Sequence, residues 1–225
     1  MKLPIDRQEY KYPGGVMKGV FLVDIFVNGG PVMYLIMFCS VIALAVLIER
    51  IRFYSRNKVN SNNLMKRVKA AISTHHFTDA MRICREDASP LANVIAAGID
   101  HLDYKKDDLL DVMRHEAMIQ VKKYDRHVGK LSTIASITPL LGLTGTVTGM
   151  ISAFSVISTV GIGDPTALAG GISEALYTTA AGLLVGIPAL VAHNWCEAKS
   201  NNFIEQVEIH SLDLANQVTA LEGNL

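Results

Sequence analysis

The chain has 225 residues, half of them apolar, and its 21 basic and 21 acidic side chains give a formal net charge of zero. This balance, without a basic stripe interleaved with aromatic residues, argues against a nucleic-acid-binding surface, so we expect no nucleic-acid partner. The three cysteines lie far apart, which argues against a disulfide framework and against a zinc site. We therefore expect no metal and no cofactor.

The N-terminal part predicts a short exposed segment followed by a first membrane span. Within residues 1–30, the apolar piece Val20–Val27 is interrupted by Asp24 and is too short to span a bilayer. It predicts a helix lying in the membrane interface or a docked N-terminal turn. Pro31 then opens an uncharged run that ends at Glu49, so residues 31–49 are predicted to form the first transmembrane helix.

Basic residues around this span predict its orientation. The 20 residues before Val32 carry one basic side chain, whereas the 20 residues after Glu49 carry seven. Because basic flanks stay in the cytoplasm, residues 50–130 are predicted to be cytoplasmic and the N-terminus periplasmic. The C-terminal segment 193–225 is also placed in the cytoplasm, by the number of spans.

The cytoplasmic region has helical patterns. Short amphipathic pieces are predicted at residues 62–73, 78–85 and 90–102. From Asp107 a longer seam of apolar residues begins, and a second seam follows the last span. The seam residues step by three and four, namely Leu110, Met113, Ala117, Val121, Tyr124, Val128 and Leu131, then Ile204, Val207, Ser211, Leu214, Val218 and Leu221. Such seams predict helices that continue from the membrane and pack on each other or on neighbouring copies.

Residues 131–192 predict a membrane hairpin. Two apolar segments, 131–157 and 168–192, are joined by a predicted periplasmic turn at residues 158–167, and no Lys or Arg occurs from Leu131 through Ala198. Each segment is long enough to cross a hydrocarbon core of about 30 Å. Both are rich in Gly, Ala, Ser and Thr, which favour close helix packing in lipid. The glycine-rich run Gly142–Gly149 is not followed by a lysine, so it does not indicate a nucleotide-binding loop or an enzyme.

The hairpin carries a polar stripe. Thr146 and Thr179 lie equally far from the centre of the turn, which places both near mid-membrane. Glu174, Thr178 and Gly182 follow one helix face, and Glu174 is the one carboxylate well inside either apolar segment. The stripe predicts groups that hydrogen-bond water or a partner. In the alternative, each threonine bonds only a backbone carbonyl one turn back.

At this point three motifs resemble a known family. The run Gly29-Gly30-Pro31-Val32-Met33 with Glu49-Arg50 is similar to the first helix of the ExbB/TolQ/MotA proton channels, most like ExbB. The run from Thr138 to Val147 resembles the second-helix signature, and the run from Glu174 to Leu183 with Ile187-Pro188-Ala189 resembles the third. Two departures stand out: Thr148 replaces the bulky aromatic of many relatives, and Thr178-Thr179 doubles the threonine.

The resemblance implies an all-α membrane protein with three transmembrane helices, two of them extended into a cytoplasmic helical bundle, that assembles as a homo-oligomeric ring, expected to be a pentamer. It implies a multi-pass protein of the bacterial inner membrane. It further implies an ExbD/TolR-like single-span partner inside the ring and a TonB-like protein that receives the mechanical work. Thr146, Thr179, Thr178 and Glu174 would line the proton pathway. The alternatives are a TolQ-like envelope-maintenance motor, a related gliding or flagellar stator, and a structural scaffold without conductance.

Overall fold

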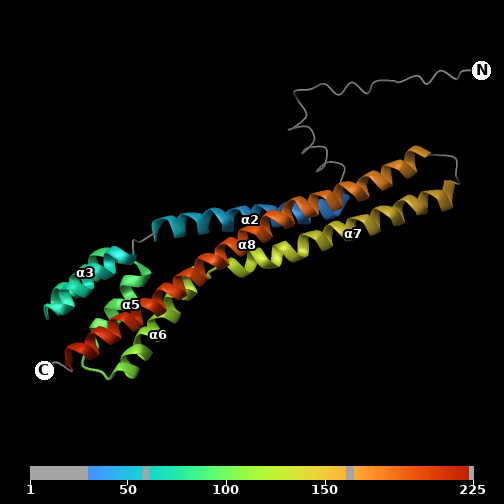
Figure 1. Cartoon of the computed structure of the whole chain (residues 1–225). Helices are drawn as coiled ribbons and strands as arrows, with labels where there is room; N and C mark the ends of the chain where they lie inside the picture. The colour runs from blue at the N-terminus through green and yellow to red at the C-terminus, as the bar shows by residue number, and fades with distance from the viewer. Residues whose placement is uncertain (1–29, 58–60, 161–164, 223–225) are drawn as a thin grey trace, which may run out of the picture. The chain divides into compact units, whose positions relative to one another are not determined.

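The computed structural model describes residues 30–57, 61–160 and 165–222, and every regular element in these ranges is a helix. The helices, drawn in Figure 1, are α2 (Gly30–Arg56), α3 (Ser61–Ser73), α4 (Phe77–Asp87), α5 (Pro90–Ile99), α6 (Lys106–Tyr124), α7 (Val128–Val160) and α8 (Pro165–Glu222). By length and composition, α2, α7 and α8 can each cross a membrane, as the hydropathy pattern predicted. The predicted N-terminal interfacial helix and the centre of the predicted turn lie outside the described residues.

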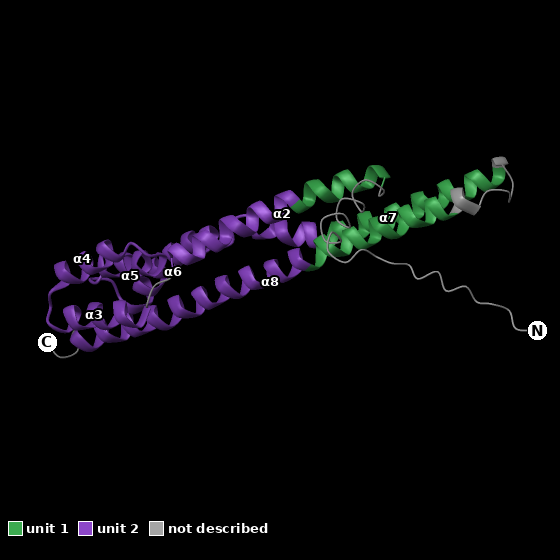
Figure 2. Ribbon diagram, turned by 90° about the horizontal axis from the view of Figure 1, so that it is seen from above, with its two compact units in different colours: residues 1–40, 136–187 green, residues 41–135, 188–225 purple. Residues whose placement is uncertain are grey.

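The chain divides into two compact units, drawn in different colours in Figure 2. Unit 1 contains residues 1–40 and 136–187, and unit 2 contains residues 41–135 and 188–225. The long helices α2, α7 and α8 each contribute to both units. The predicted polar stripe belongs to unit 1, and the short helices belong to unit 2.

Unit 1 combines the start of α2 with the membrane hairpin of α7 and α8. Met33 and Ile36 on α2 are fully buried against Ala181 on α8. Leu141 on α7 packs against the same cluster. Outward-facing side chains of α2 are large and apolar; Tyr34, Leu35 and Phe38 are all more than half exposed. Such an outward face is suited to contact with lipid.

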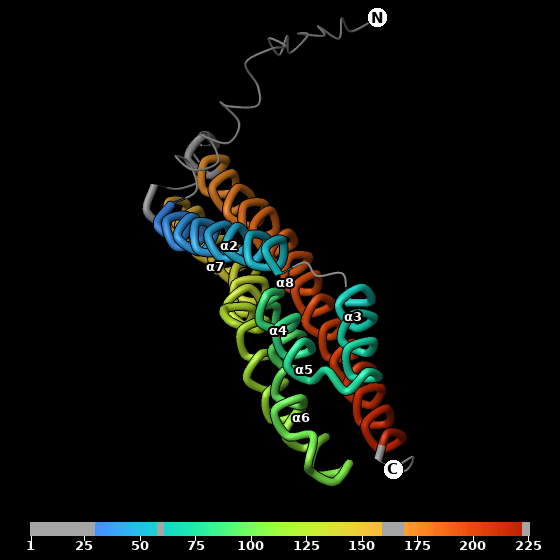
Figure 3. The backbone as a smooth tube through the Cα atoms, turned by 90° about the vertical axis from the view of Figure 1, so that its left-hand side faces the viewer, coloured from blue at the N-terminus to red at the C-terminus, as the bar shows by residue number. Residues whose placement is uncertain are grey.

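Unit 2 is a helical bundle in which α3, α4, α5 and α6 pack with the C-terminal half of α8 (Figure 3). Local signals explain the short helices. Ser89 caps α5, its hydroxyl accepting a hydrogen bond from the Ala92 amide at 3.1 Å, and Pro90 occupies the first helical position. α3 is held beside α8 by an ion pair between Lys69 and Asp213, with an Nζ–Oδ2 distance of 2.7 Å. The structure thus has helices where the three amphipathic pieces predicted them.

One expectation is wrong. The seam from Leu110 to Leu131 predicted a continuous helix, but α6 ends at Tyr124 and α7 begins at Val128. The break contains His127, whose φ of 66° lies in the left-handed region that a continuous α-helix excludes. α8, in contrast, runs without a break from Pro165 to Glu222, as the second seam predicted.

Candidate functional site

The predicted site lies on a close contact between α7 and α8 in unit 1. Small residues on α7 meet small residues on α8, so the two backbones approach each other closely. A Cβ atom built on Gly142 would lie 3.0 Å from the Thr178 carbonyl oxygen, and one built on Gly149 would lie 2.9 Å from the Gly171 carbonyl oxygen. The glycines therefore set the distance between the helices, and the threonines of α8 are held against α7.

Thr178 fills this contact. Its side chain is 1% exposed, and a Cβ atom on Gly145 would overlap it. Its hydroxyl donates to the backbone carbonyls of Ala175 at 2.9 Å and Glu174 at 3.2 Å. Within this one chain Thr178 therefore acts as a packing group whose hydroxyl is satisfied by its own helix.

Thr179 forms a hydrogen bond between the two helices. Its hydroxyl donates across the contact to the Gly142 carbonyl oxygen at 3.0 Å, and its side chain is half-buried. Because Gly142 lacks a side chain, its carbonyl is reachable from α8. The Thr179 hydroxyl bonds a carbonyl on another helix. Thr179 therefore does not fit the alternative in which each threonine bonds only a backbone carbonyl one turn back in its own helix.

Thr146 was predicted to belong to a polar stripe, but the surface around it is largely apolar. Its hydroxyl donates to the Leu143 carbonyl oxygen of its own helix at 2.6 Å. Beside it is a surface hollow of about 480 Å³, whose other lining residues are all apolar: Val147, Met150, Ile151 and Phe154. Thr148 likewise donates within α7, to the carbonyls of Thr144 and Gly145 at 3.1 Å each. In one chain, therefore, both threonines are satisfied locally.

Glu174, on α8, is half-buried, and its carboxylate lies beside the start of α2. A Cβ atom on Gly30 would overlap the Glu174 carboxylate oxygen Oε1. Gly30 has a φ of 64°, which a glycine adopts without strain. A carboxylate at a helix N-terminus is electrostatically favoured, because the first backbone N–H groups have no intrahelical partner.

The four predicted residues are thus not equivalent. Thr178 and Thr179 meet α7, Thr146 borders the hollow on α7, and Glu174 contacts the α2 start. The role of Gly30 was not predicted, although the Pro31 that follows it is typical of a helix start. Whether these side chains line a proton pathway stays a prediction.

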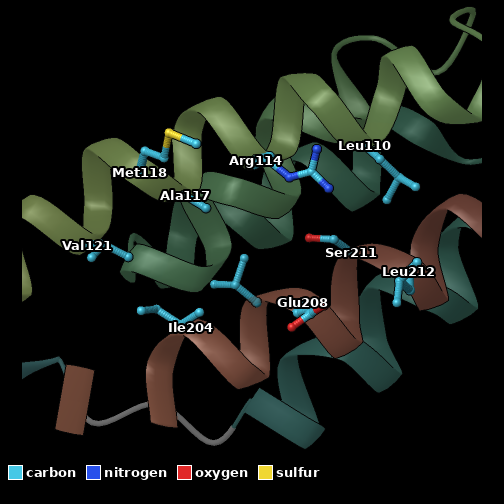
Figure 4. A pocket seen from close by; sticks show the side chains of 10 residues that line it. Leu110, Arg114, Ala117, Met118, Val121, Ile204, Glu208, Ser211 and Leu212 are labelled. Atoms are coloured by element: carbon cyan, nitrogen blue, oxygen red, sulfur yellow. The ribbon is translucent and has the colours of Figure 1, made fainter. Parts of the chain in front are cut away.

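A separate groove of about 480 Å³ lies between α6 and α8 in unit 2 (Figure 4). It is lined by Leu110, Arg114, Ala117, Met118, Val121, Ile204, Val207, Glu208, Ser211 and Leu212. Five of these, Leu110, Ala117, Val121, Ile204 and Val207, are apolar residues of the two predicted seams. The Ser211 hydroxyl is buried without a hydrogen-bond partner among the described residues. The two seams therefore face each other here, but their side chains leave a groove between α6 and α8.

Comparison with known proteins gives a consistent result. The profile of the MotA/TolQ/ExbB proton channel family matches residues 86–209, more than half of the chain. A protein named ExbB-like 1 from Synechocystis sp. is 34% identical over 175 residues, which are 76% of this chain and 68% of the relative.

Two further relatives have different names. The biopolymer transport protein ExbB of Neisseria meningitidis is 25% identical over 213 residues, which cover 88% of this chain and 90% of that protein. The Tol-Pal system protein TolQ of Haemophilus influenzae is 36% identical over 94 residues, which cover 39% of this chain and 41% of that protein. The profile and the longer matches together show that the chain belongs to the MotA/TolQ/ExbB proton channel family.

Proposed function

We propose that this chain is a subunit of a proton-driven motor in the bacterial inner membrane. It would form a homo-oligomeric ring around the membrane helix of an ExbD-like partner and convert the proton motive force into work on a TonB-like protein for outer-membrane transport. Its family membership and its three membrane-length helices support this proposal.

One observation carries the proposal. In α8, Glu174 is the one charged residue between Pro165 and Ala192, in a segment otherwise suited to lipid. A carboxylate facing lipid is costly, by about 2.5–3.5 kcal/mol at a helix centre and less toward its ends. Its position beside the α2 start compensates part of that cost. We infer that Glu174 serves the outer entrance of the pathway, concentrating cations there or passing protons toward an aspartate of the partner.

A partner is needed because this protein has no series of titratable side chains that would relay protons across the membrane. Thr146, Thr179 and Thr178 offer hydroxyls, which can order water or bond a partner but do not change charge. In the assembled ring, Thr146 and Thr179 would line the interior with Glu174. The burial of Thr178 supports a role in holding α7 and α8 together beside the pathway.

The test exchanges Glu174 for Gln and, separately, for Ala. Gln retains the size and a carbonyl acceptor but removes the charge and the titration. We expect the Glu174→Gln ring to assemble with its partner and to lose most proton flux after reconstitution of the purified complex in liposomes. Ser173→Ala, an exposed neighbour on the same helix, is the matched control and should conduct normally.

The structural alternative makes the opposite prediction. If Glu174 only fixes the start of α2, then Glu174→Gln conducts normally while Glu174→Ala weakens assembly. That result would remove Glu174 from the pathway.

A TolQ-like motor for envelope maintenance is the second candidate, and the match to the Haemophilus influenzae protein favours it. The partner that co-purifies with the chain separates the two. An ExbD-like protein with TonB supports transport, whereas a TolR-like protein supports envelope maintenance.

A further inference from the structure

Arg50 is the largest fully buried side chain in the described part of the chain, although it is charged. Its side chain is 1% exposed, and Glu49 alone separates it from the uncharged run of α2. A buried charge is costly unless it is paired and hydrogen-bonded, so the contacts of Arg50 must be extensive. Its place after a membrane span is explained by the positive-inside rule, but its burial is not.

The Arg50 guanidinium binds the end of α6. Its Nη1 donates to the carbonyl oxygens of Lys123 at 2.8 Å and Tyr124 at 3.0 Å. The Tyr54 hydroxyl, one turn further along α2, also donates to the Tyr124 carbonyl at 3.0 Å. The last carbonyls of a helix lack intrahelical donors and carry partial negative charge, so a cation there is favourable. Arg50 therefore caps the C-terminus of α6 from another helix.

The same group of side chains reaches the far side of the break before α7. Glu49 accepts a hydrogen bond from Arg50 Nε at 2.7 Å, and its Oε2 lies 3.7 Å from His127 Nδ1. His127, with its left-handed backbone, is the last residue before α7. Residues on both sides of the α6–α7 break thus contact the adjacent α2 residues Glu49 and Arg50.

Aromatic side chains pack around this joint, the α6–α7 break together with the α2 residues that contact it. The Arg50 guanidinium lies 4.7 Å from the centre of the Phe53 ring. Tyr124, whose carbonyl Arg50 binds, stacks on Phe203 of α8 with ring centres 4.3 Å apart. Because Arg has several donors in a fixed planar arrangement, it can hold two carbonyls in one direction, which a flexible ammonium cannot.

We propose that Arg50 is a positioning residue that fixes the direction in which α7, the helix that carries Thr146, leaves α6. This inference rests on the proposed function for its consequence, a correctly oriented proton pathway. The joint itself stands on the contacts of Arg50. Loss of the guanidinium leaves the two carbonyls without this donor, and the α6–α7 angle then varies.

The experiment measures the distance between α6 and α7 and, separately, the proton flux. Spin labels are placed at Met118 on α6 and Thr133 on α7, both exposed, in a chain whose three cysteines are replaced by alanine. Distances are compared for intact, Arg50→Met and Arg50→Lys complexes. Arg52→Met, which removes an exposed arginine from the same helix, is the matched control. Helicity and thermal unfolding confirm that each variant is folded.

We expect a narrow distance distribution in the intact and Arg52→Met complexes and a broad one in Arg50→Met, with Arg50→Lys between them. Proton flux should be lost in the same order. If Arg50→Met does not fold, Tyr54→Phe takes its place in the test. This variant removes one hydroxyl, keeps the ring and should broaden the distance distribution slightly.

An unchanged distance distribution in Arg50→Met overturns the proposal, as does unchanged flux in a complex whose intact form conducts. If the intact complex does not conduct, the proposed function fails. The distances alone then decide whether Arg50 positions α7.

Discussion

At the scale of single residues, the two threonines predicted to lie near mid-membrane differ in the carbonyl that each hydroxyl bonds. Thr146 bonds its own helix, whereas Thr179 bonds Gly142 on the other helix. Thr146→Val should therefore leave the free energy of unfolding unchanged. Thr179→Val should lower it by about 0.6 kcal/mol, the average for hydrogen bonds between membrane helices, and by no more than about 1.7 kcal/mol.

Function is expected to separate from stability in these variants. The double variant that combines Thr146→Val with Thr179→Val should assemble with the partner and lose most proton flux, because Val keeps the shape and removes the hydroxyls. Thr144→Val is the control, since Thr144 donates to the Leu140 carbonyl in the same way but from another face of α7. Normal flux in the double variant would show that the hydroxyls only bond the backbone.

His210 predicts a dependence of stability on pH. Burial lowers its pKa, the nearby Lys69 lowers it further, and Asp213 partly opposes this shift. The unfolded chain therefore binds a proton more readily than the folded chain. The free energy of unfolding should fall as the pH decreases below about 6.5 and level off below the lowered pKa of His210. Unfolding of wild type and His210→Gln between pH 7.5 and 5 measures this, and equal slopes would contradict it.

At the scale of elements, the α7–α8 contact depends on missing side chains. A Cβ atom on Gly182 would lie 2.5 Å from the Thr138 carbonyl oxygen, whereas one on Gly170 would have no atom within 4 Å. Gly182→Ala should force the backbones apart and cost about 1–3 kcal/mol. Gly170→Ala should be neutral or slightly stabilising, because alanine favours a helix. Thermal unfolding in detergent compares the two, and equal stability would contradict the close contact.

The elements were largely predictable because their signals are local. Ser89-Pro90 marks the start of α5, and the uncharged runs mark α2, α7 and α8. The break at His127 was not predictable, because the seam continues through it and the carbonyls it frees are bound by Arg50, more than 70 residues away in the sequence.

The candidate site was predictable only as a set of residues. Helix spacing grouped Glu174 with Thr178, but it could not show that Thr178 fills a notch at Gly145 or that Glu174 meets Gly30. Both contacts join segments far apart in the sequence. The groove between α6 and α8 is a similar case, since periodicity marks its apolar walls but not the distance between them.

At the scale of the whole molecule, the asymmetry of basic residues predicts the orientation. In a chain without native cysteines, a cysteine replacing Gly163 should react with a membrane-impermeant thiol reagent in intact spheroplasts. One replacing the exposed Asn62 should react only after permeabilisation. If Cys84 were retained, it should contribute little to the labelling, because burial raises the pKa of its thiol to about 12 and suppresses the reactive thiolate. The reverse pattern would contradict the orientation.

The proposed function requires this chain to conduct protons as a ring with a single-span partner. The most direct test is proton flux into liposomes under a potassium diffusion potential, measured with an internal pH-sensitive dye. We predict flux from liposomes that contain the purified complex and none above background from liposomes that contain this chain alone, because in the proposed mechanism a carboxyl of the partner completes the pathway. An assembled complex without proton flux would contradict the account and favour a structural scaffold.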